Sequence, residues 1–200
     1  HARARALFLK PMREGADRTA LRFSVFCADR LMAHLRPASG DKILDVYTGT
    51  GALALAASQA VGPTGRVTAI DTAESLLTRL GTKISKFGIT NIDVHTMDAA
   101  HLDFRRDYFQ HIACSLGLCW LSDPRAALRD WARVTRPGGS VNLAVLAPQA
   151  FQPQLNLLLQ RIAHFCGGQD VLVPQELVNR RETLDALLQD TGLVDVAVFE

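Results

Sequence analysis

The segment Asp45-Val-Tyr-Thr-Gly49-Thr-Gly51-Ala-Leu-Ala54 has the residue types and spacing of a ligand-binding turn. A turn between a strand and a helix needs residues without side chains where backbone N–H groups and the helix N-terminus approach a ligand. Gly49, Gly51 and Ala54 satisfy the Gly-x-Gly-x-x-Ala pattern of such turns. This pattern alone is equally compatible with a nicotinamide dinucleotide site.

Three aspartates stand where consecutive predicted strands end. Asp71 follows Gly51 by twenty residues, and an acid at this place accepts hydrogen bonds from vicinal ribose hydroxyls. Asp45 lies inside the end of the first strand, where a carboxylate suits a cationic amino group and would repel a pyrophosphate. Asp98 is placed to accept from an adenine amino group, while the backbone of the small Ala99 donates to the ring. Together the three acids favour a cationic nucleoside over an anionic dinucleotide.

Alternating strands and helices must position these residues. From Lys42 onward, short apolar runs alternate with helical patterns, which predicts a doubly wound, mainly parallel α/β sheet with right-handed crossovers. Glycine and proline residues predict turns at 62–65 and 137–139 and a helix end at Gly88. Asp17 is placed as an N-cap and predicts a helix start. The predicted strands are 43–47, 66–71, 92–97, 112–116, 140–146 and 193–199, and the predicted helices are 19–35, 52–60, 76–87, 124–135, 155–165 and 182–191.

Composition narrows the class of protein. Two hundred residues, 48% hydrophobic and 21% charged, suit one globular domain and nearly exclude a two-domain enzyme. No apolar run approaches the roughly 18 residues that span a bilayer, so we expect a soluble protein without a membrane span. Its cysteines form no Cys-x-x-Cys pair, so we expect free thiols, no metal site and a cytoplasmic location. They are Cys27, Cys114, Cys119 and Cys166.

The net charge of +2 hides an uneven distribution. Residues 1–42 carry nine Lys and Arg against four Asp and Glu, a balance of +5, while the remainder carries thirteen against sixteen, a balance of −3. Such a basic lobe could steer an anionic ligand or nucleic acid. A solvated helix face is the commoner reason for such a lobe.

From about Asp17 to its end, the chain resembles the class I S-adenosylmethionine-dependent methyltransferases. The matching pieces are 43–51, 67–71, Met97-Asp-Ala99 and 123–139, and the last is most similar to the small-molecule branch related to the ubiquinone and menaquinone C-methyltransferases. The resemblance implies S-adenosylmethionine as cofactor, with Asp71 on the ribose, Asp98 and Ala99 around the adenine, and the glycine turn and the loop after the fourth strand against the methionyl part. The implied cofactor-binding residues are Asp45, Tyr47, Gly49, Gly51, Asp71, Thr72, Asp98, Ala99, Ser115 and Leu116.

The sequence departs from the family pattern in two places. Tyr47 stands where the family prefers Gly or Ala, and it either crowds the methionine pocket or points its ring into the adjacent helix; we favour the second. Cys119-Trp120 stands where many relatives carry a histidine, so no catalytic base is assigned by resemblance. His101, three residues after Asp98, is a weak candidate for that base.

We divide the single domain into a helical cap (1–40), a cofactor-binding core (41–147), a helical insertion over the acceptor site (148–180) and a final helix and strand (181–200). Methyl transfer is an in-line displacement that needs alignment and exclusion of water more than a base. The apolar cap and insertion predict a small hydrophobic or aromatic acceptor, although these helices could equally just cover the sheet.

Three other functions stay open. A nucleic-acid methyltransferase is disfavoured because residues 113–119 lack Asn-Pro-Pro-Tyr and Pro-Cys elements and no Lys/Arg cluster is interleaved with aromatics. We therefore expect no nucleic-acid partner. A nicotinamide-dependent oxidoreductase and a protein that binds the cofactor without transferring a methyl group are the other two.

The end of the chain raises a further expectation. The sheet of the resembling family is completed by a seventh, antiparallel strand, and nothing after Phe199 is left to form it. We expect a truncated piece of a longer protein, in keeping with the first residue, His1. The alternative is a six-stranded variant whose valine-rich edge is covered by a second copy of the chain, a homodimer.

Overall fold

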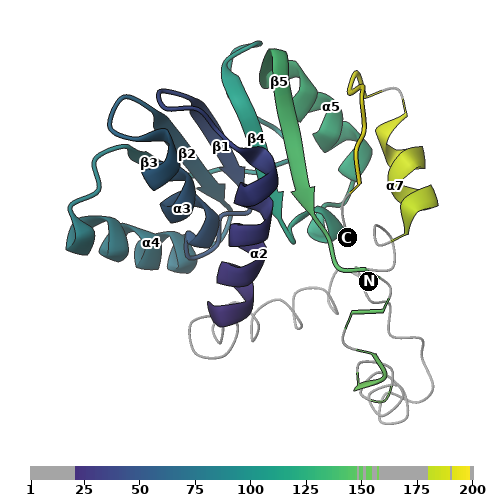
Figure 1. Ribbon diagram of the computed structural model, residues 1–200, viewed down its shortest axis with the longest axis horizontal. Coiled ribbons are helices and arrows are strands. Elements are labelled where there is room, and N and C mark those ends of the chain that lie inside the picture. Colours follow the sequence, from purple (N-terminus) through teal and green to yellow (C-terminus); the bar gives the residue numbers. More distant parts are fainter. Residues whose placement is uncertain are drawn as a thin grey trace.

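A five-stranded parallel sheet forms the centre of the protein (Figure 1). The structure is a computed structural model that describes residues 21–147, 149–150, 152–154, 157, 180–189 and 191–198. The strand order is β3-β2-β1-β4-β5, so the order reverses between β1 and β4. The predicted doubly wound α/β architecture is thereby confirmed. The strands are β1 (Lys42–Val46), β2 (Arg66–Asp71), β3 (Ile92–Thr96), β4 (Phe109–Ser115) and β5 (Thr135–Ala144), and the helices are α2 (Leu21–Leu35), α3 (Ala52–Val61), α4 (Glu74–Phe87), η1 (Leu118–Trp120), α5 (Pro124–Val134) and α7 (Arg181–Leu188).

The register of the sheet separates two apolar clusters. Ile43 pairs with His111 and Leu44 with Ile112, so side chains alternate between the two faces along each strand. One face carries Ile43, Val67, Ala69 and Ala113 under α2, α3 and α4. The other face carries Leu44, Val46, Ile70 and Ile112 against α5, with α7 beside it. Burial on both faces explains why the central strands β1, β2 and β4 are rich in apolar residues.

Local capping signals set the helix ends. Asp123 is the N-cap of α5 and accepts a hydrogen bond from the Ala126 amide at 2.9 Å, and Pro124 occupies the first turn. Gly88 ends α4 in the left-handed conformation, at φ 63°. Both ends agree with the sequence-based prediction.

The predicted strand 193–199 is wrong over the residues that the structure describes, 193–198, which form no strand. Asp195 has φ 56°, which interrupts an extended run, and Val194 is 80% exposed. A strand also needs a neighbour to satisfy its backbone donors and acceptors, and no described strand pairs with this segment.

The predicted boundary of the fifth strand is wrong as well. β5 begins at Thr135, which pairs with Phe109, and the next pair joins Ser140 to His111. The predicted turn at 137–139 is therefore an irregularity inside the strand, where Gly138 takes φ 77°.

The N-terminal helix packs on the sheet. Ala28, Leu31 and Leu35 of α2 are buried with Ile43 and Ala113. None of the helices in the described ranges has the length and apolar character needed to cross a membrane. Three predictions fall outside the described residues: the helix start at Asp17, the free thiol of Cys166, and most of the insertion 148–180 with nearly all of its helix 155–165.

Gly51 couples the sheet to α4. It has φ 84°, and a Cβ placed on it would lie 2.2 Å from Leu80 Cδ1. An alanine there would be strained in its backbone and would also push Leu80 out of the core.

We therefore expect Gly51→Ala to lower the free energy of unfolding by about 2 kcal/mol or more, measured by urea denaturation. Gly81→Ala, inside α4 with open space around its Cβ position, is the matched control. It should raise stability by about 0.5–1 kcal/mol because alanine is the better helix former. Equal effects of the two substitutions would contradict this account.

Candidate functional site

Backbone hydrogen bonds bring the carboxyl ends of the strands together. The Thr48 amide donates to Ile70 O at 3.0 Å, and the Met97 amide donates to Asp71 O at 3.1 Å. On the other side of β1, the Leu116 amide donates to Ala144 O at 2.9 Å. The ends of β1, β2 and β3, with the predicted residues Asp45, Asp71 and Asp98, thus meet at one edge of the sheet.

Asp71 links two loops. Its Oδ2 accepts from the Gly49 amide at 3.0 Å, and its Oδ1 accepts from the Ala73 amide at 2.9 Å. The residue is only 5% exposed. Each carboxylate oxygen accepts one backbone hydrogen bond and keeps a lone pair for another donor. A ligand hydroxyl could therefore bind Asp71 without breaking either loop contact.

Asp45 is a buried acid below the start of α3. Its Oδ2 accepts from the Thr48 hydroxyl at 2.6 Å. Burial raises the pKa of this carboxyl to about 7, and the nearby Asp71 charge adds to the rise, while hydrogen bonds from Thr48 and the Ala54 backbone oppose it. At neutral pH the group can therefore exchange its proton for a ligand cation.

The glycine turn is held from α4. Gly49 and Gly51 have φ 57° and 84°, and the Gly51 amide donates to Thr48 O at 2.9 Å. Lys83 Nζ donates to Thr50 O at 2.8 Å, one helical turn beyond Leu80, which lies against Gly51. Gly51 is the N-cap of α3 and offers no side-chain acceptor, so backbone amides of the first turn are left for a ligand.

Two residues other than glycine adopt the left-handed conformation where the strand order reverses. Tyr47, after β1, has φ 58°, and Leu116, after β4, has φ 63°. A Cβ on Gly117 would lie 2.6 Å from Tyr47 Cβ, so the tyrosine lies against the loop after β4. Its side chain packs with the apolar cluster on the α5 face. Strained backbone of this kind gathers at functional sites.

The third acid lies on the surface. The Asp98 side chain is 58% exposed, its Oδ1 accepts from the Ala100 amide at 2.9 Å, and its Oδ2 lies 3.5 Å from His101 Nδ1. His101 is itself 86% exposed, so its role as a base stays a prediction. Ala99 is buried, and its carbonyl accepts from Trp131 Nε1 at 2.7 Å.

Helix α5 fixes the loop that carries Asp98. Arg133 donates to Phe104 O at 2.7 Å and to Leu102 O at 3.0 Å, and it pairs with Asp130 at 2.6 Å. Asp130 also accepts from the Leu102 amide at 2.8 Å. Sequence reasoning missed these supports, together with Thr48 and Lys83. The one signal was the similarity of 123–139 to a family motif, which does not reveal what its polar residues bind.

The structure also places the other residues that the sequence singled out, which lie at or after the ends of β2 and β4. Ser115 ends β4, and Thr72 is exposed after β2. Cys119 Sγ donates to Leu116 O at 3.6 Å, and burial raises the pKa of the neighbouring Cys114 thiol. Within the described ranges no cluster of His, Cys, Asp and Glu could hold a metal ion.

Comparisons with known proteins point to one family. Residues 43–139 match the family model described as a methyltransferase domain. A demethylmenaquinone methyltransferase of Staphylococcus aureus strain JH9 is 36% identical over 134 residues, which cover 67% of this chain and 53% of the relative. The chain thus spans about half the length of the curated relatives it matches.

Solved structures show the same fold. A SAM-dependent methyltransferase from Aquifex aeolicus aligns with a TM-score of 0.69 at 21% identity over 91% of this chain and 87% of that one. Coclaurine N-methyltransferase bound to N-methylheliamine and SAH aligns with a TM-score of 0.55 at 19% identity over 60% of this chain and 35% of that one.

The pKa of Asp45 makes stability depend on pH in a defined direction. Its folded value of about 7 lies above the ordinary 3.8, so its contribution to stability falls as pH rises between these values. Asparagine has no carboxyl group to ionise, so the Asp45→Asn variant does not lose stability in this way. From pH 5 to pH 8, urea denaturation should show the stability of the variant relative to wild type rising by about 1–3 kcal/mol. The exposed Asp103→Asn is the control, and parallel profiles for Asp45→Asn and wild type would refute the assignment.

Proposed function

We propose that this chain transfers a methyl group to a small hydrophobic or aromatic acceptor. Through its residues 43–139, the chain belongs to the class I S-adenosylmethionine-dependent methyltransferases. The observation that carries the proposal is the set of three aspartates around one glycine turn. Asp45, Asp71 and Asp98 end three neighbouring strands, and Asp71 accepts a hydrogen bond from Gly49 within that turn.

The described residues fit S-adenosylmethionine. Asp45 offers a buried carboxyl whose charged form is stabilised by an ammonium group, and Asp71 keeps free lone pairs for the two ribose hydroxyls. Asp98 would accept from the adenine amino group, and the Ala99 amide would donate to the ring. The first turn of α3 and the loop at Ser115 and Leu116 would hold the methionyl part, and Thr72 would stand on the ribose side.

The bound cofactor supplies an electrophilic methyl group on a sulfonium. The residues of the chain bind it, align it with the acceptor and exclude water, which is where much of the rate enhancement in such displacements originates. Tyr47 and Leu116 stand on either side of the strand-order reversal, so they are placed to shape the methyl-facing wall. Our proposal includes no catalytic base.

The name of one relative supports the acceptor class. The Staphylococcus aureus relative is named for a demethylmenaquinone substrate, which is an apolar aromatic quinone.

We place the protein in the cytoplasm, with no nucleic-acid partner, and the free thiols of Cys27, Cys114 and Cys119 support a reducing compartment. The functional division at residues 40, 147 and 180 belongs to the proposal too. A homodimer through a sixth-strand edge does not, because residues 193–198 form no strand.

Loss of the Asp71 carboxylate should weaken the cofactor site. In Asp71→Asn, one amide nitrogen must face the N–H of Gly49 or Ala73, and one ribose acceptor is lost. We expect calorimetry to show S-adenosylhomocysteine binding at least about tenfold weaker, a loss of about 1.4 kcal/mol or more. Asp103→Asn removes an exposed acid of the loop between β3 and β4 that is not among the predicted cofactor-binding residues, and it should change affinity less than about twofold. Unchanged affinity in a folded Asp71→Asn protein would overturn the assignment.

The acceptor class is tested with labelled S-adenosylmethionine. Methyl transfer to hydroxynaphthoquinones or catechols, and none to bulk RNA or DNA, is the expected outcome because residues 113–119 lack the Asn-Pro-Pro-Tyr and Pro-Cys elements of nucleic-acid methyltransferases. Label found only on nucleic acid would reverse the proposal. Cofactor binding without transfer to any small molecule would favour a binding protein instead.

A further inference from the structure

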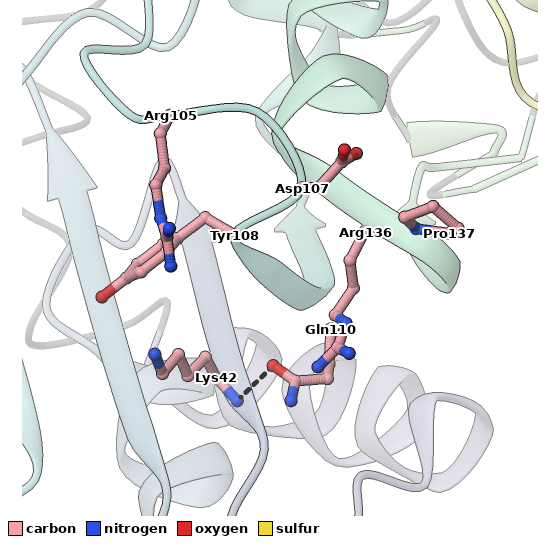
Figure 2. Close-up of a pocket in the computed structure, with 7 residues that line it drawn as sticks. All are labelled: Lys42, Arg105, Asp107, Tyr108, Gln110, Arg136 and Pro137. Carbon is pink, nitrogen blue, oxygen red and sulfur yellow. Dashed lines mark hydrogen bonds between the residues drawn. The ribbon is translucent and has the colours of Figure 1, made fainter.

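A cavity lies at the opposite end of the sheet from the glycine turn. It has a volume of about 320 Å³ and stands at the amino ends of β1, β4 and β5, where Lys42, Gln110 and Arg136 lie (Figure 2). The charged and polar residues that line it are Lys42, Arg105, Asp107, Tyr108, Gln110 and Arg136. Since cofactor sites in open parallel sheets lie at the carboxyl ends, the proposed methyl transfer does not use this cavity.

The lining is strongly basic. Lys42, Arg105 and Arg136 supply three cations against the single carboxylate of Asp107. None of these three cations takes part in a salt bridge among the residues that the structure describes. In Figure 2 the Asp107 carboxylate points away from the head groups of Lys42 and Arg136. The cavity therefore carries positive charge without a matching acid.

The ring of Tyr108 contacts two of the cations. Lys42 Nζ lies 4.5 Å and Arg105 Cζ lies 5.1 Å from the centroid of its ring. Such cation–π contacts offset part of the repulsion between like charges without neutralising either one. The Lys42 amide donates to Gln110 Oε1 at 3.0 Å, which fixes the Gln110 side chain and leaves its NH₂ group as a donor.

We propose that this cavity binds the diphosphate group of a small soluble anion. Two guanidinium groups offer paired N–H donors that match phosphate oxygens, and Lys42 adds a point charge. The volume of about 320 Å³ suits a diphosphate with a small organic substituent.

The test is calorimetric titration of the whole chain with inorganic pyrophosphate at constant ionic strength. The double variant Arg105→Gln/Arg136→Gln should bind at least about tenfold more weakly, because it loses both guanidinium forks. Arg106→Gln, which removes a neighbouring exposed arginine that does not line the cavity, is the matched control and should change affinity less than about twofold. Losses of equal size in the double variant and the control would show general charge attraction and overturn the site.

A gain-of-affinity variant keeps the test independent of folding defects. Asp107 has φ 58°, a conformation that asparagine also tolerates, so Asp107→Asn removes the one acid without straining the backbone. We expect pyrophosphate to bind about two- to fivefold more tightly to this variant. No gain would contradict a site inside this cavity.

Two further arms separate other sources of the effect. The first arm measures binding of the chain to phosphatidylglycerol vesicles. If the chain binds these vesicles through Arg105 and Arg136 but does not bind pyrophosphate, the ligand is a lipid surface and the proposal is overturned. S-adenosylhomocysteine affinity should be the same in all cavity variants. If pyrophosphate binds as expected while cofactor binding fails, the methyltransferase proposal falls and the anion site stands.

Discussion

One carboxylate holds the two loops that a cofactor site needs in fixed positions. Asp71 accepts from the Gly49 amide with one oxygen and from the Ala73 amide with the other. The first contact fixes the glycine turn after β1, and the second fixes the loop that leads into α4. In the proposed cofactor site, these bonds hold the Asp71 oxygens in the orientation in which they would accept the ribose hydroxyls, which lowers the ordering cost of binding.

The surroundings of this carboxylate are rigid and strained at once. Tyr47 and Leu116 hold left-handed backbone that costs of order 1–3 kcal/mol each, and packing against Gly117 and the bond from Leu116 to Ala144 O keep them there. On the third strand, α5 holds the loop after β3 through Arg133 and Trp131. Three separate supports therefore converge on one edge of the sheet.

Sequence patterns predicted what depends on local chemistry. The glycine turn, the acids at the strand ends, the helix end at Gly88 and the helix start at Pro124 each follow from a residue type that has few alternatives in its position. The start of β5 and the fate of residues 193–198 depend on which strand is available for pairing, which no local pattern encodes. The bonds from Lys83 to Thr50 and from Arg133 to Leu102 join distant segments for the same reason. The basic cavity likewise combines Lys42, Arg105 and Arg136, which only the folded sheet brings together.

The bond from Trp131 to Ala99 has a spectroscopic consequence. The indole is fully buried and donates to the carbonyl directly after Asp98, so its polarity and hydrogen bonding are tied to the position of that loop. The wavelength and intensity of indole fluorescence change when the polarity or hydrogen bonding around the ring changes. The unmodified protein thus contains its own optical probe beside the loop that we propose to face the adenine. Ligand binding at that loop can be followed in real time without attaching a dye.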